Sequence, residues 1–477
     1  VEGGERMGND QLEALMLEAG YLREDGTVGL KVFARAVGGQ AGKTFSHTYV
    51  RRWLDGMVPR DAQTRAAIAS ALGQRLGRQI SLAEIGFGKA QNVRADLGLD
   101  YPDRVQDSVN SAARLWQADI DSMSTLLDTP ANAAAWNEAA LSWLVTTRDD
   151  VLSDTGKRKV GEADIRGIRK TTEMFDALDG EHGGGHARSA LIEFLRTDLA
   201  GILAGYTANE PLRKELFKAA TQATLLGAWM SYDAGLHGLA QRYFIQALRI
   251  SESANDRLLG ASVLDAMSHQ ATFLGRYKEA ANLARTARMG TTLSGSPSAA
   301  AHFHAMEARA LARLGDSAGC DKAMAAAVKE FDRREPESDP ADWFSYFNEA
   351  ELAAELGHCN RDLGRPNDGV TYATQSLGPT ASGYVRSDFF VTMVLADSHL
   401  DNGDVGQACD VALRAIDIGE SLKSARCGAY VDEFRTRLTG IGQTAESADF
   451  FDRVSTARLW TPQDAKRVPS RAGLHLS

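Results

Sequence analysis

A pattern that recurs every 40 residues places the strongest constraint on the fold. Its markers are three glycines, Gly235, Gly275 and Gly315, which lie 40 residues apart. Each is preceded by a small residue and followed by small or apolar residues, giving the units Ala228, Gly235, Ala240, Phe244, Ala247; Ser268, Gly275, Ala280, Ala284, Ala287; and Ala308, Gly315, Cys320, Met324, Ala327. Weaker copies surround Gly364 and Gly403. Two antiparallel helices pack closely when small residues occupy their crossing and a glycine turns the chain, so the pattern predicts stacked helix pairs.

The pattern resembles the tetratricopeptide repeat, with a spacing near 40 residues instead of about 34. The first helix of each such repeat lines a concave groove. By position, the resemblance places there Trp229, Tyr232, Asp233, Asp265, His269, Arg309, Arg313, His358, Arg361 and Asp397. Their mixed charge suits a peptide, small-molecule or protein ligand. At any single position, the favoured interpretation is a polar side chain on an exposed helix face, but for the set as a whole a ligand or partner is favoured over none.

Charge divides the chain into a basic and an acidic part. The net charge is -10, but residues 31–80 hold nine Lys/Arg against two acids, a local balance of +7 that leaves -17 elsewhere. Such asymmetry is typical of a nucleic-acid contact confined to one small domain. A basic run can also be a merely solvated surface, so charge alone does not decide between these interpretations.

Apolar periodicity predicts a small helical head around this basic segment. We expect one helix before Gly20, a second from about Leu30 that stops at the Gly38–Gly39 pair, and a third from about Ser46. A fourth follows Pro59, and a short closing helix lies within residues 77–87. The connection from residue 38 to residue 45 is then longer than the three or four residues of a simple helix-turn-helix.

The predicted third helix has two different faces. At about 100° per residue, Val50, Trp53 and Leu54 fall on one side. Short polar and arginine side chains fall on the other, as a helix that enters the major groove requires. We therefore expect contacts to double-stranded DNA from Lys43, Thr44, Ser46, His47, Thr48, Arg51, Arg52 and Arg60.

The head resembles the Cro/C1 class of helix-turn-helix domains, and most closely actinobacterial regulators of sporulation and antibiotic production. The resemblance covers about residues 10–90 and rests on the segment Ser46 to Gly56, the pair Pro59-Arg60 and the closing segment Gly77 to Gly86. Residues 227–235 and 240–244 also resemble the repeat body of those regulators. The resemblance implies a DNA-binding transcription regulator.

We therefore expect an all-α chain in which an N-terminal helix-turn-helix domain is followed by a tetratricopeptide-like α-solenoid. The expected divisions are a DNA-binding domain at 8–90, a linker at 91–110, a helical region at 111–221 with a loop at 179–186, repeats at 222–450 and a tail at 451–477. No stretch approaches the 18 to 20 apolar residues of a membrane-spanning helix, so we expect a cytoplasmic protein, nucleoid-associated when bound to DNA.

Neither catalysis nor metal binding is predicted. The cysteines lack paired C-x-x-C spacing, and His182 and His186 flank three glycines without a supporting third ligand. No nucleophile elbow, H-E-x-x-H or phosphate-binding loop is present, so we expect neither enzyme activity nor a cofactor. The favoured interpretation is a dimeric transcription regulator controlled through its repeats. The alternative is a protein–protein interaction adaptor that does not bind DNA.

Overall fold

The structure is a computed structural model. It describes residues 9–461 except 24, 79, 81, 83, 88–93, 122–123, 128, 146–156, 293–294, 336–338, 340–345, 379–383 and 443. The chain divides into two compact units, one comprising residues 1–95 with 116–129 and the other 96–115 with 130–477. Below, the head is the described part of residues 9–87, and the array is the described part of residues 210–461.

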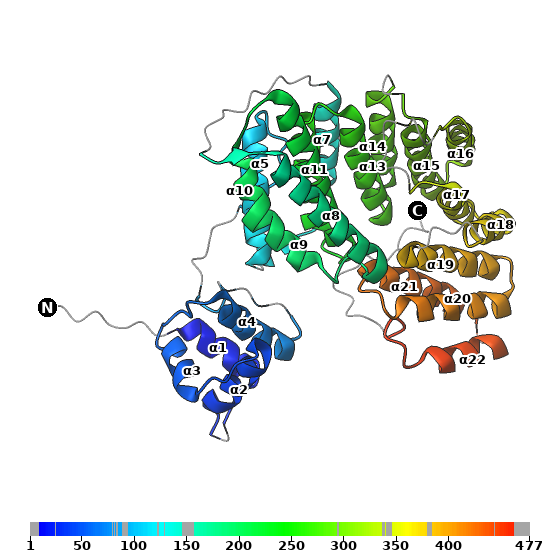
Figure 1. Ribbon diagram of the computed structural model, residues 1–477. Helices are drawn as coiled ribbons and strands as arrows, with labels where there is room; N and C mark the ends of the chain where they lie inside the picture. Colours follow the sequence, from blue (N-terminus) through cyan, green and yellow to red (C-terminus); the bar gives the residue numbers. More distant parts are fainter. Residues whose placement is uncertain are drawn as a thin grey trace. The chain divides into compact units, whose positions relative to one another are not determined.

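The head contains four helices around one apolar core (Figure 1). They are α1 (Asp10–Glu18), α2 (Leu30–Ala41), α3 (His47–Leu54) and α4 (Ala62–Leu76). Side-chain caps begin two of them: Asn9 accepts a hydrogen bond from the Leu12 amide, and Asp61 accepts one from the Thr64 amide. Large buried side chains, among them Phe33 and Trp53, fill the centre. Their burial explains why the three-and-four spacing of apolar residues in the sequence produces these helices.

The prediction that the second helix ends at the Gly38–Gly39 pair is wrong. Helix α2 continues to Ala41 and is capped by Gly42, whose φ of 60° is left-handed. A Cβ atom on Gly38 would lie 2.6 Å from the Lys43 carbonyl oxygen, so glycine is needed there for the close approach of the following turn. The connection to α3 therefore shrinks to residues 42–46.

The predicted closing helix is also wrong for the described residues of 77–87, which form turns. Ile80, Ile85 and Phe87 are nevertheless buried in the head core. The Asn9 side-chain amide donates to the Ile85 carbonyl at 2.7 Å. This segment therefore closes the head by apolar burial and tertiary hydrogen bonds instead of helix formation.

Residues 94–104, expected to be linker, are in part bound firmly to the array. The side chains of Arg242, Gln246 and Arg249 on α12 (His237–Glu252) are fully buried. They donate hydrogen bonds of 2.6 to 3.0 Å to the backbone carbonyls of Leu97, Gly98, Asp100, Pro102 and Asp103. The expectation failed because donors almost 150 positions away satisfy this backbone.

A helical region precedes the repeats. Its elements are α5 (Val105–Ile120), α6 (Ser124–Leu127), α7 (Ala133–Val145), β1 (Lys159–Val160), α8 (Glu162–His182), α9 (Arg188–Phe194), η1 (Leu195–Leu199), α10 (Ala200–Leu203) and β2 (Tyr206–Thr207). Strands β1 and β2 pair in parallel. The loop predicted at 179–186 is shorter than expected, because α8 continues to His182.

The array consists of helix pairs, and the all-α repeat solenoid is thereby confirmed (Figure 1). The pairs are α11 (Glu210–Asp233) with α12, α13 (Arg257–Phe273) with α14 (Tyr277–Gly290), α15 (Pro297–Leu314) with α16 (Ser317–Asp332), α17 (Glu349–Asp362) with α18 (Pro366–Ser376), and α19 (Val385–Asp401) with α20 (Val405–Gly419). Helices α21 (Ala425–Ile441) and α22 (Ala445–Val454) follow. The array starts at Glu210, before the predicted residue 222.

The repeat glycines turn the chain as predicted. Their φ angles are 82° at Gly235, 75° at Gly275 and Gly315, 69° at Gly364 and 78° at Gly403. Residues other than glycine rarely adopt this left-handed backbone conformation. The small residues at the predicted helix crossings, such as Ala240, Ala280 and Cys320, are fully buried.

Candidate functional site

Helix α3 has the two faces predicted for it. Val50, Trp53 and Leu54 are buried in the head core. All eight candidate DNA contacts, namely Lys43, Thr44, Ser46, His47, Thr48, Arg51, Arg52 and Arg60, are exposed. Phe45 in the preceding turn packs edge-on against Trp53 with ring centroids 5.5 Å apart, which ties the turn to the core. The head thus presents a polar, basic surface on a firmly packed helix.

Some basic residues of the head are used to hold its fold. Arg65 donates to the Pro59 carbonyl at 2.8 Å, and Arg75 donates to the Gly20 carbonyl at 2.9 Å. The Arg75 guanidinium also lies 4.1 Å from the Tyr21 ring centroid. Arg78 forms an ion pair with Glu84 at 2.7 Å. These three arginines account for part of the local positive charge and already make contacts within the head.

Other basic residues are left free. Within the described part of the head, Arg51, Arg52 and Arg60 form no ion pair. Lys43 lies 3.5 Å from Asp61, but both side chains are about half exposed, and solvent-exposed ion pairs contribute little to stability. The hydrogen bonds from Thr64 hold the pKa of Asp61 below its usual range, so this carboxylate serves chiefly as the α4 cap. Lys43 can therefore leave it at small cost.

The ten predicted groove residues lie mostly inside the array, which corrects the expectation that they are open to a ligand. Trp229, His269 and Arg313 are half-buried, while Tyr232, Asp233, Asp265, Arg309, His358, Arg361 and Asp397 are buried. Successive first helices contact one another, α13 with α15 and α17 with α19 among them. The polar side chains on these helices are therefore largely enclosed by their neighbours.

Buried ion pairs join the first helices of successive repeats. Arg361 lies 3.0 Å from Asp397, and Arg437 approaches the same carboxylate at 2.9 Å. Further pairs are Arg309–Glu355 at 3.1 Å, Arg313–Asp362 at 3.2 Å and Asp265–His302 at 2.9 Å. Burial lowers and the Asp265 carboxylate raises the pKa of His302, with a net rise. Removal of one partner from such pairs leaves a buried charge uncompensated.

Asp233 connects the first and last parts of the array. Its carboxylate accepts hydrogen bonds from the Gly184 amide at 2.8 Å and from the Ser424 hydroxyl at 2.9 Å. Arg386 and Arg426 lie 3.5 and 3.7 Å from it. We call these five residues the clasp, because they join α11 to α19, α21 and the loop after α8.

The tight packing of the loop after α8 explains why it contains three glycines. A Cβ atom on Gly184 would lie 2.7 Å from the Met230 carbonyl oxygen, and one on Gly185 would lie 2.8 Å from that of Lys423. The Gly185 amide also donates to the Lys423 carbonyl at 2.9 Å. The glycine run therefore allows backbone to pass between α11 and the start of α21. Sequence reasoning missed Arg386, Arg426 and Arg437, because no repeat position marks them.

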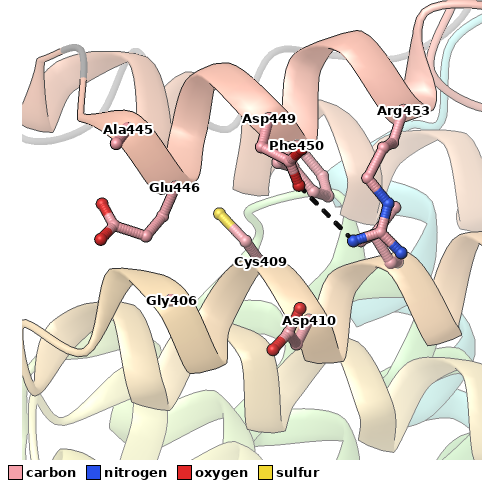
Figure 2. Close-up of a pocket in the computed structure, with 9 residues that line it drawn as sticks. Gly406, Cys409, Asp410, Ala445, Glu446, Asp449, Phe450 and Arg453 are labelled. Atoms are coloured by element: carbon pink, nitrogen blue, oxygen red, sulfur yellow. Dashed lines mark ion pairs between the residues drawn. The ribbon is translucent and has the colours of Figure 1, made fainter.

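A surface pocket of about 310 Å³ lies between α20 and α22 (Figure 2). Cys409 lines it together with Asp410, Glu446 and Asp449, and Asp449 forms an ion pair with Arg453 at 3.6 Å. Burial, followed by the nearby carboxylates, raises the pKa of the Cys409 thiol to about 11. The thiol is therefore protonated at neutral pH and is a weak nucleophile.

The described residues offer neither a metal site nor a membrane-spanning helix. They contain no cluster of three or more His, Cys, Asp and Glu side chains arranged to hold a metal ion. None of their helices combines the length and apolar character needed to cross a membrane.

Comparison with known proteins singles out the head. Residues 12–88 match the family described as the SP15 N-terminal domain. This range runs from buried Leu12 in α1 to just beyond buried Phe87, so it coincides with the compact head and excludes the array. No curated protein matches the chain.

Proposed function

We propose that this chain is a DNA-binding transcription regulator whose head is a helix-turn-helix domain of the Cro/C1 type. Helix α2 and the turn at residues 42–46 support α3, which enters the major groove. The observation that carries the proposal is the contrast within the head. Arginines that hold its fold are engaged, whereas Arg51 and Arg52 project from α3 without a carboxylate partner among the described residues.

The exposed residues divide into two roles. Arg51 and Arg52, with His47 and Thr48, occupy the outward face of α3, where side chains reach base edges and adjacent phosphates. Lys43 and Arg60 flank α3 in the turns before and after it, and there they contact phosphates. Phosphate contacts supply salt-dependent affinity, and base contacts supply sequence preference.

The array serves as the dimerising and regulatory body in this proposal. A homodimer presents two α3 helices about one turn of DNA apart, and a peptide, small-molecule or protein partner of the array changes their spacing. The ten inner residues are already matched within the protein, so the proposal does not assign them to that partner. The resemblance to regulators of sporulation and antibiotic production suggests target genes of those kinds, in a cytoplasmic, nucleoid-associated protein.

The direct test is recovery of DNA bound to the full chain in cells. Wild-type protein is compared with Arg51→Ala/Arg52→Ala and with Arg333→Ala/Arg453→Ala, which removes the same charge from exposed positions of the array. We expect discrete enriched sites for the wild type and the array variant, and their loss in the α3 variant.

Two outcomes would count against the proposal. Equal recovery by all three proteins would show that α3 is not the contact. An absence of enriched sites, together with stoichiometric recovery of a protein partner, would favour an adaptor that binds no DNA.

A further inference from the structure

One aromatic side chain of the head is unlike the others. Tyr49 on α3 is 46% exposed, whereas Tyr21, Phe33, Trp53 and Phe87 are buried. Among the Phe, Tyr and Trp residues in the described part of the head, it is the only one that is exposed and not buried or half-buried. Packing of the head core therefore does not account for this ring.

Tyr49 borders the basic face of α3. At about 100° per residue, it lies on the same exposed side as Thr48 and Arg52, next to the buried edge formed by Trp53. Its hydroxyl group forms no hydrogen bond with the described residues. An exposed ring with a polar tip thus lies beside Arg52, one of the two arginines that the proposed function places in the major groove, whereas Arg51 lies almost opposite on the helix.

The Tyr49 ring is held in position. Phe45 packs edge-on against it, with ring centroids 5.8 Å apart and planes at 78°. Phe45 itself packs against buried Trp53 at 5.5 Å. A ring fixed through this contact to the core loses little conformational freedom when it binds, which favours its use as a contact.

We propose that Tyr49 is a specificity-determining residue that contacts the C5-methyl group of a thymine in the major groove. This inference rests on the proposed function. Thymine carries the one apolar group that a base presents there, and an apolar side chain selects for it. The ring covers the methyl group, while Arg52 beside it contacts a polar base edge or a phosphate.

The test removes the methyl group from thymine in the DNA and leaves the wild-type protein unchanged. A duplex is selected from a random pool with the full chain, and each thymine in it is then replaced singly by deoxyuridine. Wild-type protein should lose affinity about fourfold at one position, the value of one methyl-sized apolar group. Tyr49→Ala should be insensitive at that position, and Tyr49→Phe, which keeps the ring, should retain the sensitivity.

The outcomes separate this inference from the function on which it rests. If Tyr49→Ala binds the selected duplex and keeps the wild-type sensitivity, or if no replacement affects the wild type, the thymine contact is overturned while DNA binding stands. If no duplex can be selected, the proposed function fails and the inference fails with it. Leu22→Ala, at another exposed apolar position of the head, is the control and should leave the deoxyuridine sensitivity unchanged.

Discussion

The head and the array are both helical, but they place their charged side chains in opposite environments. The head has an apolar core, with Arg51, Arg52 and Arg60 exposed around it. The array buries Arg361 and Asp397 as an ion pair between its helices. The difference shows that an arginine in a helical chain can be exposed or part of the fold, depending on whether a carboxylate or a backbone carbonyl of the protein accepts its hydrogen bonds.

The largest effect should come from removing Asp233. Asp233→Ala leaves Arg386 and Arg426 without this carboxylate and breaks two hydrogen bonds, so we expect a loss of about 3 to 5 kcal/mol in unfolding free energy of the array. Denaturant unfolding measures it. Asp449→Ala, which removes one exposed pair with Arg453, is the control and should cost about 0 to 1 kcal/mol. Equal effects would remove the contrast between buried and exposed charges.

The unfolding free energy of the array should also depend on pH through His237, with a smaller effect than the loss of Asp233. Burial, and secondarily the charge of Arg426, lowers the pKa of His237 from 6.5 to about 4. Between these values, the unfolded chain binds more protons at His237 than the folded chain does. The contribution of the neutral, buried His237 to the unfolding free energy is therefore complete above pH 6.5 and is lost as the pH falls toward 4.

The difference between wild type and His237→Phe isolates this contribution, because other groups titrate equally in both proteins. We expect wild type to lose about 2 kcal/mol relative to the variant between pH 7.5 and pH 5. Thermal unfolding of the array at a series of pH values measures the difference. Parallel curves for the two proteins would mean that His237 is not held neutral by burial.

Two adjacent glycines of the head offer the smallest and most closely matched comparison. A Cβ atom on Gly38 would lie 2.6 Å from the Lys43 carbonyl oxygen, whereas a Cβ atom on Gly39 would have no other atom within 4 Å. We expect Gly38→Ala to destabilise the head by at least about 1 kcal/mol, and Gly39→Ala to stabilise it by about 0.5 to 1 kcal/mol. Hydrogen exchange of the head amides in increasing urea measures both. Similar effects at the two sites would show that the turn does not need the close approach.

Local patterns predicted local structure well. The spacing of Gly235, Gly275 and Gly315 marked the turns of the array, because the left-handed backbone conformation at these turns strongly favours glycine. The apolar spacing of Val50, Trp53 and Leu54 likewise marked the buried face of α3, whose opposite face holds the candidate contacts.

Features that depend on distant partners could not be predicted from the sequence. The end of α2 was misplaced because Gly38 packs against the later Lys43 backbone. Residues 97–103 were expected to be linker, because the sequence gives no sign that their hydrogen-bond donors lie on distant α12. The groove residues were expected to be open because no sequence signal showed that Arg361 meets Asp397.

The proposed function depends most on whether Arg51 and Arg52 contact DNA phosphates and bases. The most direct measurement is a salt titration of full-chain affinity for the selected duplex, for wild type, Arg51→Ala/Arg52→Ala and Arg333→Ala/Arg453→Ala. If both arginines contact phosphates, the α3 variant should bind more weakly, with a slope of log affinity against log salt shallower by about 2, while the array variant matches wild type. Unchanged affinity and slope in the α3 variant would contradict the account.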